Sequence, residues 1–174
     1  QPEGTLSKII KGFEPRDQQQ NMMRNIIEAY NHDQIALIEA GTGTGKSIAY
    51  LIPAILWAAQ RKERSVISTH TITLQEQLLI KDIPIVCKAL NVTIKAVLVK
   101  GMRNYACLRK IEETRGEQLI LHPQEAEEFA KIDAWAHNTP DGSKSSLSFE
   151  PSSQIWDKVC AENDTCNKNH CPYY

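Results

Sequence analysis

A glycine-rich segment followed by lysine and serine has the residue types of a phosphate-binding loop. The segment reads Ala40-Gly41-Thr42-Gly43-Thr44-Gly45-Lys46-Ser47. Small residues let successive backbone N–H groups turn towards phosphate oxygens, a lysine there reaches the β- and γ-phosphates, and a hydroxyl holds Mg²⁺. The strict pattern has glycine where Ala40 stands, and alanine is small enough to take that place. We predict a site for ATP and Mg²⁺ in which Lys46 and Ser47 carry the catalytic roles.

The alternative is an ordinary glycine turn beside an unrelated Lys-Ser pair. The flanks favour the nucleotide site, because residues 34–38 (QIALI) predict a strand and residues 46–60 predict an almost wholly apolar helix. Upstream, the amide of Gln19 has a donor and an acceptor, the complement of the adenine edge. Gln19 also belongs to a run of three glutamines, so a solvated surface residue is the other interpretation.

Two further segments have residue types suited to a nucleic-acid backbone. The first follows a predicted strand at 65–68, at the end of a strand where ligands collect in open α/β sheets. Its candidates are Thr69, His70, Thr71 and Gln75. The second combines two cations and an aromatic ring, which suit phosphates and a stacked base. Its candidates are Lys100, Arg103 and Tyr105. For the first segment the alternative is that a threonine caps a helix. For the second segment the alternative is a solvated loop.

Four of the five cysteines are candidate metal ligands. Cys160, Cys166 and Cys171 lie close together in sequence, and Cys107 is remote. Their spacing is wider than the short knuckles typical of zinc sites, whereas iron–sulfur clusters accept more varied spacing. Unrelated free thiols are the third interpretation. Cys87 lies in an apolar run and is predicted to be ordinary core.

The elements that must position these residues alternate along the first part of the chain. Predicted strands at 34–38, 65–68 and 94–99 alternate with helical patterns at 16–30, 46–60 and 74–90. This alternation predicts an α/β fold with a parallel sheet covered on both faces. After residue 99 an acidic helix at 123–136 and a polar loop at 138–153 follow, without a further strand. We therefore place a domain boundary near residue 104.

Composition narrows the class of protein. The 174 residues include 20 Lys and Arg against 21 Asp and Glu, a net charge of −1, so the chain is not a uniformly basic nucleic-acid coat. The longest apolar stretch is about a dozen residues, short of the roughly 20 that span a bilayer. We expect a cytoplasmic, monomeric protein without membrane contact. The first residue is not methionine, so we expect a piece of a longer protein.

Five segments together resemble a known helicase family. They read GFEPRDQQQ (12–20), EAGTGTGKS (39–47), STHTITLQEQLL (68–79), GMRNYAC (101–107) and CNKNHCPYY (166–174). In this order they resemble the iron–sulfur branch of superfamily 2 DNA helicases, and within it the bacterial DinG-like enzymes. The resemblance implies an incomplete P-loop RecA-like motor domain at 1–104. It also implies a mostly helical, truncated iron–sulfur domain at 105–174.

The resemblance also implies residue roles. Gln19 and Arg16 would belong to the adenine-recognition motif, and residues 69–75 would contact single-stranded DNA. Cys107, Cys166 and Cys171 would bind a [4Fe–4S] cluster, with a fourth ligand beyond Tyr174. In the alternative, Cys160 completes the set.

Some parts of the family pattern are absent from the sequence. No Asp-Glu-x-His motif occurs, and the second motor domain with its arginine finger is missing. We therefore expect negligible hydrolysis by this piece alone. The parent would be an ATP-dependent DNA helicase, active in DNA repair, that moves 5′ to 3′ on single-stranded DNA. The alternatives are a P-loop kinase with a structural zinc and a metal-stapled nucleic-acid-binding module.

Overall fold

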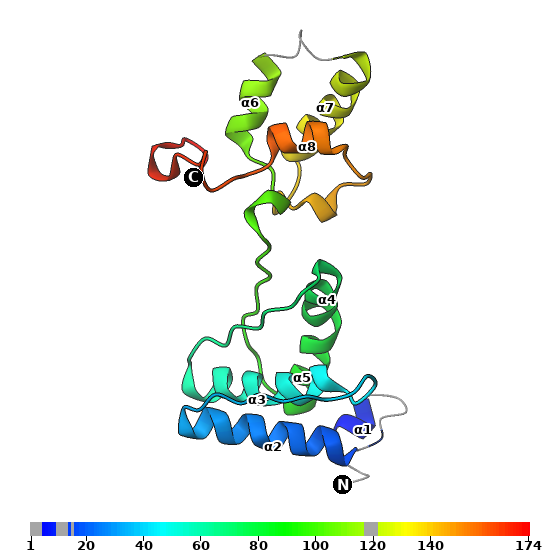
Figure 1. Cartoon of the computed structure of the whole chain (residues 1–174), viewed down its shortest axis with the longest axis vertical. Coiled ribbons are helices and arrows are strands. Elements are labelled where there is room, and N and C mark those ends of the chain that lie inside the picture. Colours follow the sequence, from blue (N-terminus) through cyan, green and yellow to red (C-terminus); the bar gives the residue numbers. More distant parts are fainter. Residues whose placement is uncertain (1–4, 10–13, 15, 117–121) are drawn as a thin grey trace. The chain divides into compact units, whose positions relative to one another are not determined.

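The computed structural model describes residues 5–9, 14, 16–116 and 122–174. The chain divides into two compact units, Gln1–Leu98 and Val99–Tyr174, which are shown in Figure 1 and described separately below. Of the first predicted motif, at 12–20, residues 12, 13 and 15 lie outside the described residues.

Unit 1 is built from helices around a small apolar core. Its helical elements are α1 (Thr5–Ile9), α2 (Asp17–His32), α3 (Lys46–Arg61), α4 (Ile72–Gln77), the π-helical segment η1 (Leu78–Asp82) and α5 (Ile83–Leu90). The buried core comes from three of them and consists of Leu51, Ile52, Ile55, Leu78 and Val86. The three predicted helices of this unit are confirmed, with α2 and α3 each extending slightly beyond the predicted end.

Helix α3 is the centre of unit 1 because its sequence is apolar nearly all round. Ala49, Leu51 and Ile55 are at most 3% exposed, and α2 lies beside α3 in Figure 1. A helix that is apolar on most faces is stable only when neighbours cover it. The helix begins at Lys46 and ends at Arg61, and the two residues that flank it, Gly45 and Lys62, have left-handed backbone angles.

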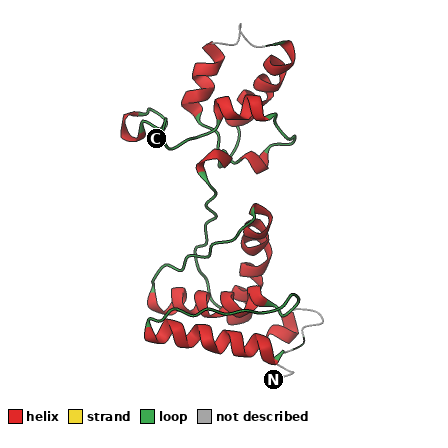
Figure 2. Cartoon of the chain, viewed as in Figure 1, coloured by secondary structure: helices red, strands yellow, loops and turns green. Residues whose placement is uncertain are grey.

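The predicted sheet is not confirmed. Within the described ranges no segment is assigned as a strand, and the segments at 34–38, 65–68 and 94–99 are extended loops (Figure 2). In the segments at 65–68 and 94–99 a two-residue period of burial is nevertheless visible, because Ile67 and Ile94 pack against the core while Val66 and Val97 are 91% and 72% exposed. Burial of every second side chain requires only that one face of the segment packs against the core. A β-strand also requires a neighbouring strand whose backbone pairs with its N–H and C=O groups.

Unit 2 has a separate core. Its elements are η2 (Met102–Asn104), α6 (Leu108–Gly116), α7 (Pro123–Ala136), η4 (Lys144–Ser146), α8 (Ser153–Val159) and η5 (Lys168–His170). The buried residues are Ile111, Phe129, Ile132, Ala136, Ile155, Trp156, Val159 and Cys160.

Helix α7 confirms the predicted acidic helix at 123–136. His122 and Glu125 form a capping box at its start, and Pro123 occupies the first turn, where a missing N–H is not costly. Phe129, Ile132 and Ala136 share one face at helical spacing and are buried, so the acidic residues face outward.

Residues 105–107 join distant parts of unit 2. Tyr105 forms an isolated antiparallel bridge with Ser143, and Ala106 forms one with Cys160. The backbone N–H of Cys107 donates to the carbonyl of Val159 at 2.7 Å. The start of α6 is therefore held against the end of α8.

Candidate functional site

The glycine-rich loop lies between the extended segment at 34–40 and the first turn of α3. Gly43 and Gly45 both have φ of +76°, a conformation that strains any residue with a Cβ atom. Such turns aim successive backbone N–H groups to one side, and the N-terminus of a helix adds further free N–H donors. The loop therefore has the backbone form expected of an anion site.

The side chain of Lys46 folds back onto this loop. Its Nζ donates to the carbonyl oxygens of Ala40 and Gly41, at 3.0 and 2.8 Å. The hydroxyl of Thr44, which is 8% exposed, donates to the carbonyl of Gly41 at 2.9 Å. Lys46 itself is exposed and Ser47 is half-buried. The ammonium group thus lies where incoming phosphate oxygens could replace the two carbonyls as its partners.

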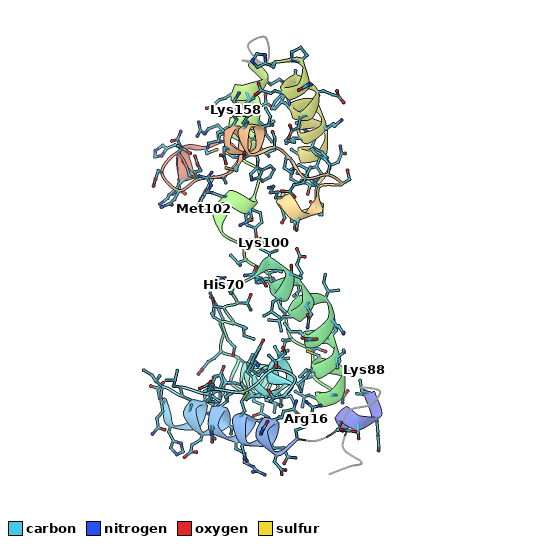
Figure 3. All side chains as sticks on the ribbon, turned by 45° about the vertical axis from the view of Figure 1, so that its right-hand side comes forward. Arg16, His70, Lys88, Lys100, Met102 and Lys158 are labelled. Atoms are coloured by element: carbon cyan, nitrogen blue, oxygen red, sulfur yellow. The ribbon has the colours of Figure 1, made fainter. Side chains whose placement is uncertain are left out.

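Two side chains from the start of α2 also contact the loop. Gln19, which is 6% exposed, donates from Nε2 to the carbonyl of Gly45 at 3.1 Å. Arg16, labelled in Figure 3, donates from Nη1 to the carbonyl of Gly43. The structure therefore brings both residues of the expected adenine-recognition motif to the loop backbone.

The residues predicted at 69–75 include a helix cap. The hydroxyl of Thr71 accepts a hydrogen bond from the backbone N–H of Leu74 at 3.3 Å, which makes Thr71 the N-cap of α4. The hydroxyl of Thr69 donates to the carbonyl of Thr71 at 3.1 Å. His70, labelled in Figure 3, lies in the loop before α4, and Gln75 is half-buried within it. Their contact with DNA stays a prediction.

The residues of the second predicted DNA contact form hydrogen bonds and ion pairs with other residues of unit 2. Lys100 Nζ donates to the hydroxyls of Ser143 and Ser145 at 2.9 and 2.5 Å, and the Lys100 backbone N–H donates to the Tyr105 hydroxyl at 3.0 Å. Arg103 pairs with Asp157 at 2.6 Å, one of its two carboxylate partners. These side chains have a structural role in the unit, and a role in DNA binding stays a prediction.

Glu162 is the shared acceptor of two cations in unit 2. It pairs with Lys110 at 2.7 Å and with Arg103 at 2.9 Å. The hydrogen bond from Lys110 holds the pKa of Glu162 below its ordinary value. Arg109 adds a further link, since its Nη2 donates to the carbonyl of Thr165 at 2.8 Å. The segment that carries Cys166 is therefore attached to α6 close to Cys107.

All five cysteines lie in the described part of the chain and are free thiols. Cys160 is fully buried in the core of unit 2, where burial raises the pKa of its thiol. Cys107, Cys166 and Cys171 are half-buried. Among the described residues no three Cys, His, Asp or Glu side chains gather closely enough to hold a metal ion. The predicted ligands are thus not assembled into a metal site in this structure.

Cys87 is half-buried and packs against the core of unit 1, and burial raises the pKa of its thiol. This agrees with the prediction that Cys87 is an ordinary core residue. Sequence reasoning missed two contacts, from Arg109 to the carbonyl of Thr165 and from Lys110 to Glu162, because the partners are 56 and 52 residues apart and leave no local pattern.

None of the described helices combines the length and the hydrophobicity that crossing a membrane requires.

Three curated bacterial proteins show how far the similarity extends. The chain is 38% identical over 174 residues to the ATP-dependent DNA helicase YoaA of Escherichia coli, which covers 99% of the chain and 27% of that protein. It is 34% identical over 174 residues to the 3′-5′ exonuclease DinG of Bacillus subtilis, and this match covers 96% of the chain and 18% of that protein. It is 33% identical over 173 residues to the ATP-dependent helicase DinG of Mycobacterium tuberculosis, and this match covers 89% of the chain and 26% of that protein. The chain therefore spans about a quarter or less of the length of these relatives.

The family model described as DEAD/DEAH box helicase matches residues 16–140. The match begins at the arginine that contacts the loop and includes the whole glycine-rich segment. Because it covers well over half of the 174 residues, the chain belongs to the DEAD/DEAH box helicase family.

Proposed function

We propose that the protein containing this chain is an ATP-dependent DNA helicase of the DinG and YoaA group, and that this chain supplies its nucleotide-binding loop. The observation that carries the proposal is the loop itself, with Gly43 and Gly45 in the left-handed region and Lys46 at its carbonyls. The names of the relatives support the helicase activity. The family match does not favour a kinase or a metal-stapled binding module.

In this proposal each loop residue has a separate part in binding ATP. The N–H groups of residues 41–47 bind the phosphates, with Ala40 at the start of the loop. Lys46 neutralises charge on the β- and γ-phosphates. Ser47 would hold Mg²⁺, whose positive charge would offset the negative charge that develops on the phosphates. Hydrolysis also needs a group that orients the attacking water, and the Asp-Glu-x-His motif expected for that step does not occur in these 174 residues.

We further propose that Thr69, His70, Thr71 and Gln75 contact single-stranded DNA and that movement runs 5′ to 3′. The full-length protein with ATP should then displace a strand from a duplex that has a 5′ single-stranded tail. It should leave a duplex with a 3′ tail intact. Gel separation of labelled strands measures both, with ADP in place of ATP as the control. The opposite tail preference would contradict the direction, and displacement of neither duplex would contradict helicase activity.

We also propose a [4Fe–4S] cluster bound by Cys107, Cys166 and Cys171 in the full-length protein. Two features support it: the three thiols are free and half-buried, and Arg109 attaches the segment of Cys166 near Cys107. Cys160 is the less favoured ligand, because it is fully buried as part of the core. A thiolate-bound cluster would supply a rigid covalent link between these distant segments.

Protein purified without oxygen should be brown and contain iron and sulfide. Replacing Cys107, Cys166 or Cys171 by serine should remove most of the iron. Cys160→Ala and the matched control Cys87→Ala should keep it. Iron and sulfide analysis with visible absorption measures the result. Colourless protein with stoichiometric zinc would contradict the cluster, and loss of iron in Cys160→Ala would assign Cys160 as a ligand instead.

A further inference from the structure

Helices α4 and α5 form one continuous helix through the π turn η1. Leu78, Asp82 and Ile83 all have right-handed helical backbone angles. The backbone N–H of Ile83 donates to the carbonyl of Leu78, five residues back, where a regular α-helix bonds four residues back. Single π turns inside α-helices occur frequently at functional sites. This one directly follows α4, which contains Gln75 and has Thr71 as its N-cap, two of the residues predicted to contact single-stranded DNA.

The apolar pattern of this helix changes phase at the π turn. The residues that pack against the core of unit 1 include Leu74, Leu78, Ile83, Cys87 and Leu90. Neighbours in this series are three or four residues apart, except Leu78 and Ile83, which are five apart. A regular α-helix turns by about 100° per residue, so it would place Leu78 and Ile83 about 140° apart. The π turn absorbs the additional residue and brings both halves of the helix onto one core.

Two further features favour the π turn over a regular helix. Pro84 lacks the N–H that would bond to Ile80, and in a regular helix its ring would clash with the Ile80 carbonyl. Asp82, which is 7% exposed, accepts a hydrogen bond on Oδ2 from Gln77 Nε2 at 3.2 Å. Gln77 and Asp82 are five residues apart, so a regular helix would hold them about 140° apart. Their bond therefore spans the π turn and stabilises it.

The π turn determines how α4 is rotated about its own axis. One residue more or less within a helix rotates the part before it by about 100°. Leu74 and Leu78 face the core only because the turn absorbs one residue. The same rotation determines the direction in which Thr71 and Gln75 point.

We infer that Gln77, Asp82 and Pro84 are positioning residues, which set the rotation of α4 for binding single-stranded DNA by favouring the π turn. The inference rests on the proposed DNA contact of Thr69, His70, Thr71 and Gln75. It names residues outside that contact on which the contact depends, and none of them needs to touch DNA.

The test first removes the features that favour the π turn. Full-length protein with both Asp82→Ala and Pro84→Ala is titrated with fluorescent oligothymidine, followed by anisotropy, and with Mg·ADP, followed by calorimetry. A regular helix can then form and turn α4 away from its DNA-binding orientation. Affinity for the oligonucleotide should fall about tenfold, the factor that corresponds to one lost hydrogen bond. Affinity for Mg·ADP should not change, because the glycine-rich loop is unaltered.

Deleting Lys81 in this double variant should restore DNA binding. Lys81 is exposed, and its removal leaves Leu78 and Ile83 four residues apart, a spacing that keeps both on one face of a regular helix. Oligonucleotide affinity should return to that of the unaltered protein, whereas a deletion would only add to general damage of the fold. Lys81→Ala is the matched control and should bind both ligands as the unaltered protein does.

Unchanged oligonucleotide binding in the double variant would overturn the inference. Equal weakening of Mg·ADP would overturn it as well, and so would failure of the Lys81 deletion to restore binding. If the double variant does not fold, Gln77→Leu removes only the exposed donor of the side-chain bond and should weaken DNA binding by a smaller factor. Unchanged DNA binding in Gln77→Leu would then contradict the inference. If the unaltered protein does not bind the oligonucleotide, the proposed DNA contact itself is wrong, so the two failures are distinguishable.

Discussion

Replacing Lys46 by alanine in the full-length protein is expected to lower ATP hydrolysis stimulated by single-stranded DNA by about 10²–10³-fold. The ammonium group of Lys46 lies at the carbonyls of Ala40 and Gly41, at the mouth of the loop. A preorganised donor stabilises the charge that develops in the transition state, and removing one such donor typically lowers the rate by a factor of this size. Steady-state phosphate release with and without DNA measures it.

Lys88→Ala is the matched control, because Lys88 is an exposed lysine in the last turn of α5 (Figure 3). It should hydrolyse ATP at the rate of the unaltered protein. Lys46→Ala should also unfold at an unchanged temperature, since the side chain is exposed. An unchanged hydrolysis rate in Lys46→Ala would show that this loop is not the catalytic site.

Phe129→Ala is expected to destabilise unit 2 by about 3–5 kcal/mol, the usual cost of truncating a fully buried aromatic side chain. Phe129 is 1% exposed and belongs to the core shared by α6, α7 and α8. Since a domain is typically stable by about 5–15 kcal/mol, the loss is a large part of the total. Hydrogen exchange of the full-length protein should show faster exchange in peptides from these three helices.

Lys158→Ala is the control for this experiment, because Lys158 is exposed on α8 (Figure 3). A surface substitution of this kind typically changes stability by less than about 0.5 kcal/mol. Peptides from unit 1 should keep their exchange rates in both variants, because unit 1 has its own core. Unchanged protection of α7 in Phe129→Ala would contradict the assigned core.

Elements whose signal is local could be predicted from the sequence. The loop and α3 follow from glycines, a Lys-Ser pair and an apolar run, all within about twenty residues. Helix α7 follows from a helix-start proline and from Phe129 and Ile132 at helical spacing. In these cases the residues that determine the structure are neighbours in the chain.

Features that depend on distant partners could not be predicted. The sequence around Arg103 suggests a cation free for DNA, whereas its partners Asp157 and Glu162 lie 54 and 59 residues away. The burial of Cys160 depends on the packing of α7 and α8, which the spacing of cysteines does not encode. The apolar pattern at 34–38 predicts a strand, but a strand forms there only if a neighbouring segment pairs with its backbone.

The exposed apolar side chains of the extended segments have a practical consequence. Ile35 and Leu37 are fully exposed, and Val66 and Val97 are 91% and 72% exposed, on segments that are not helical. Extended apolar segments of this kind pair readily with one another between molecules. When the 174 residues are expressed alone, the nearest available neighbour is a second copy of the same segment. We therefore expect such a preparation to form inclusion bodies and to be captured by chaperones, and Leu37→Lys or Val97→Lys should increase its soluble fraction.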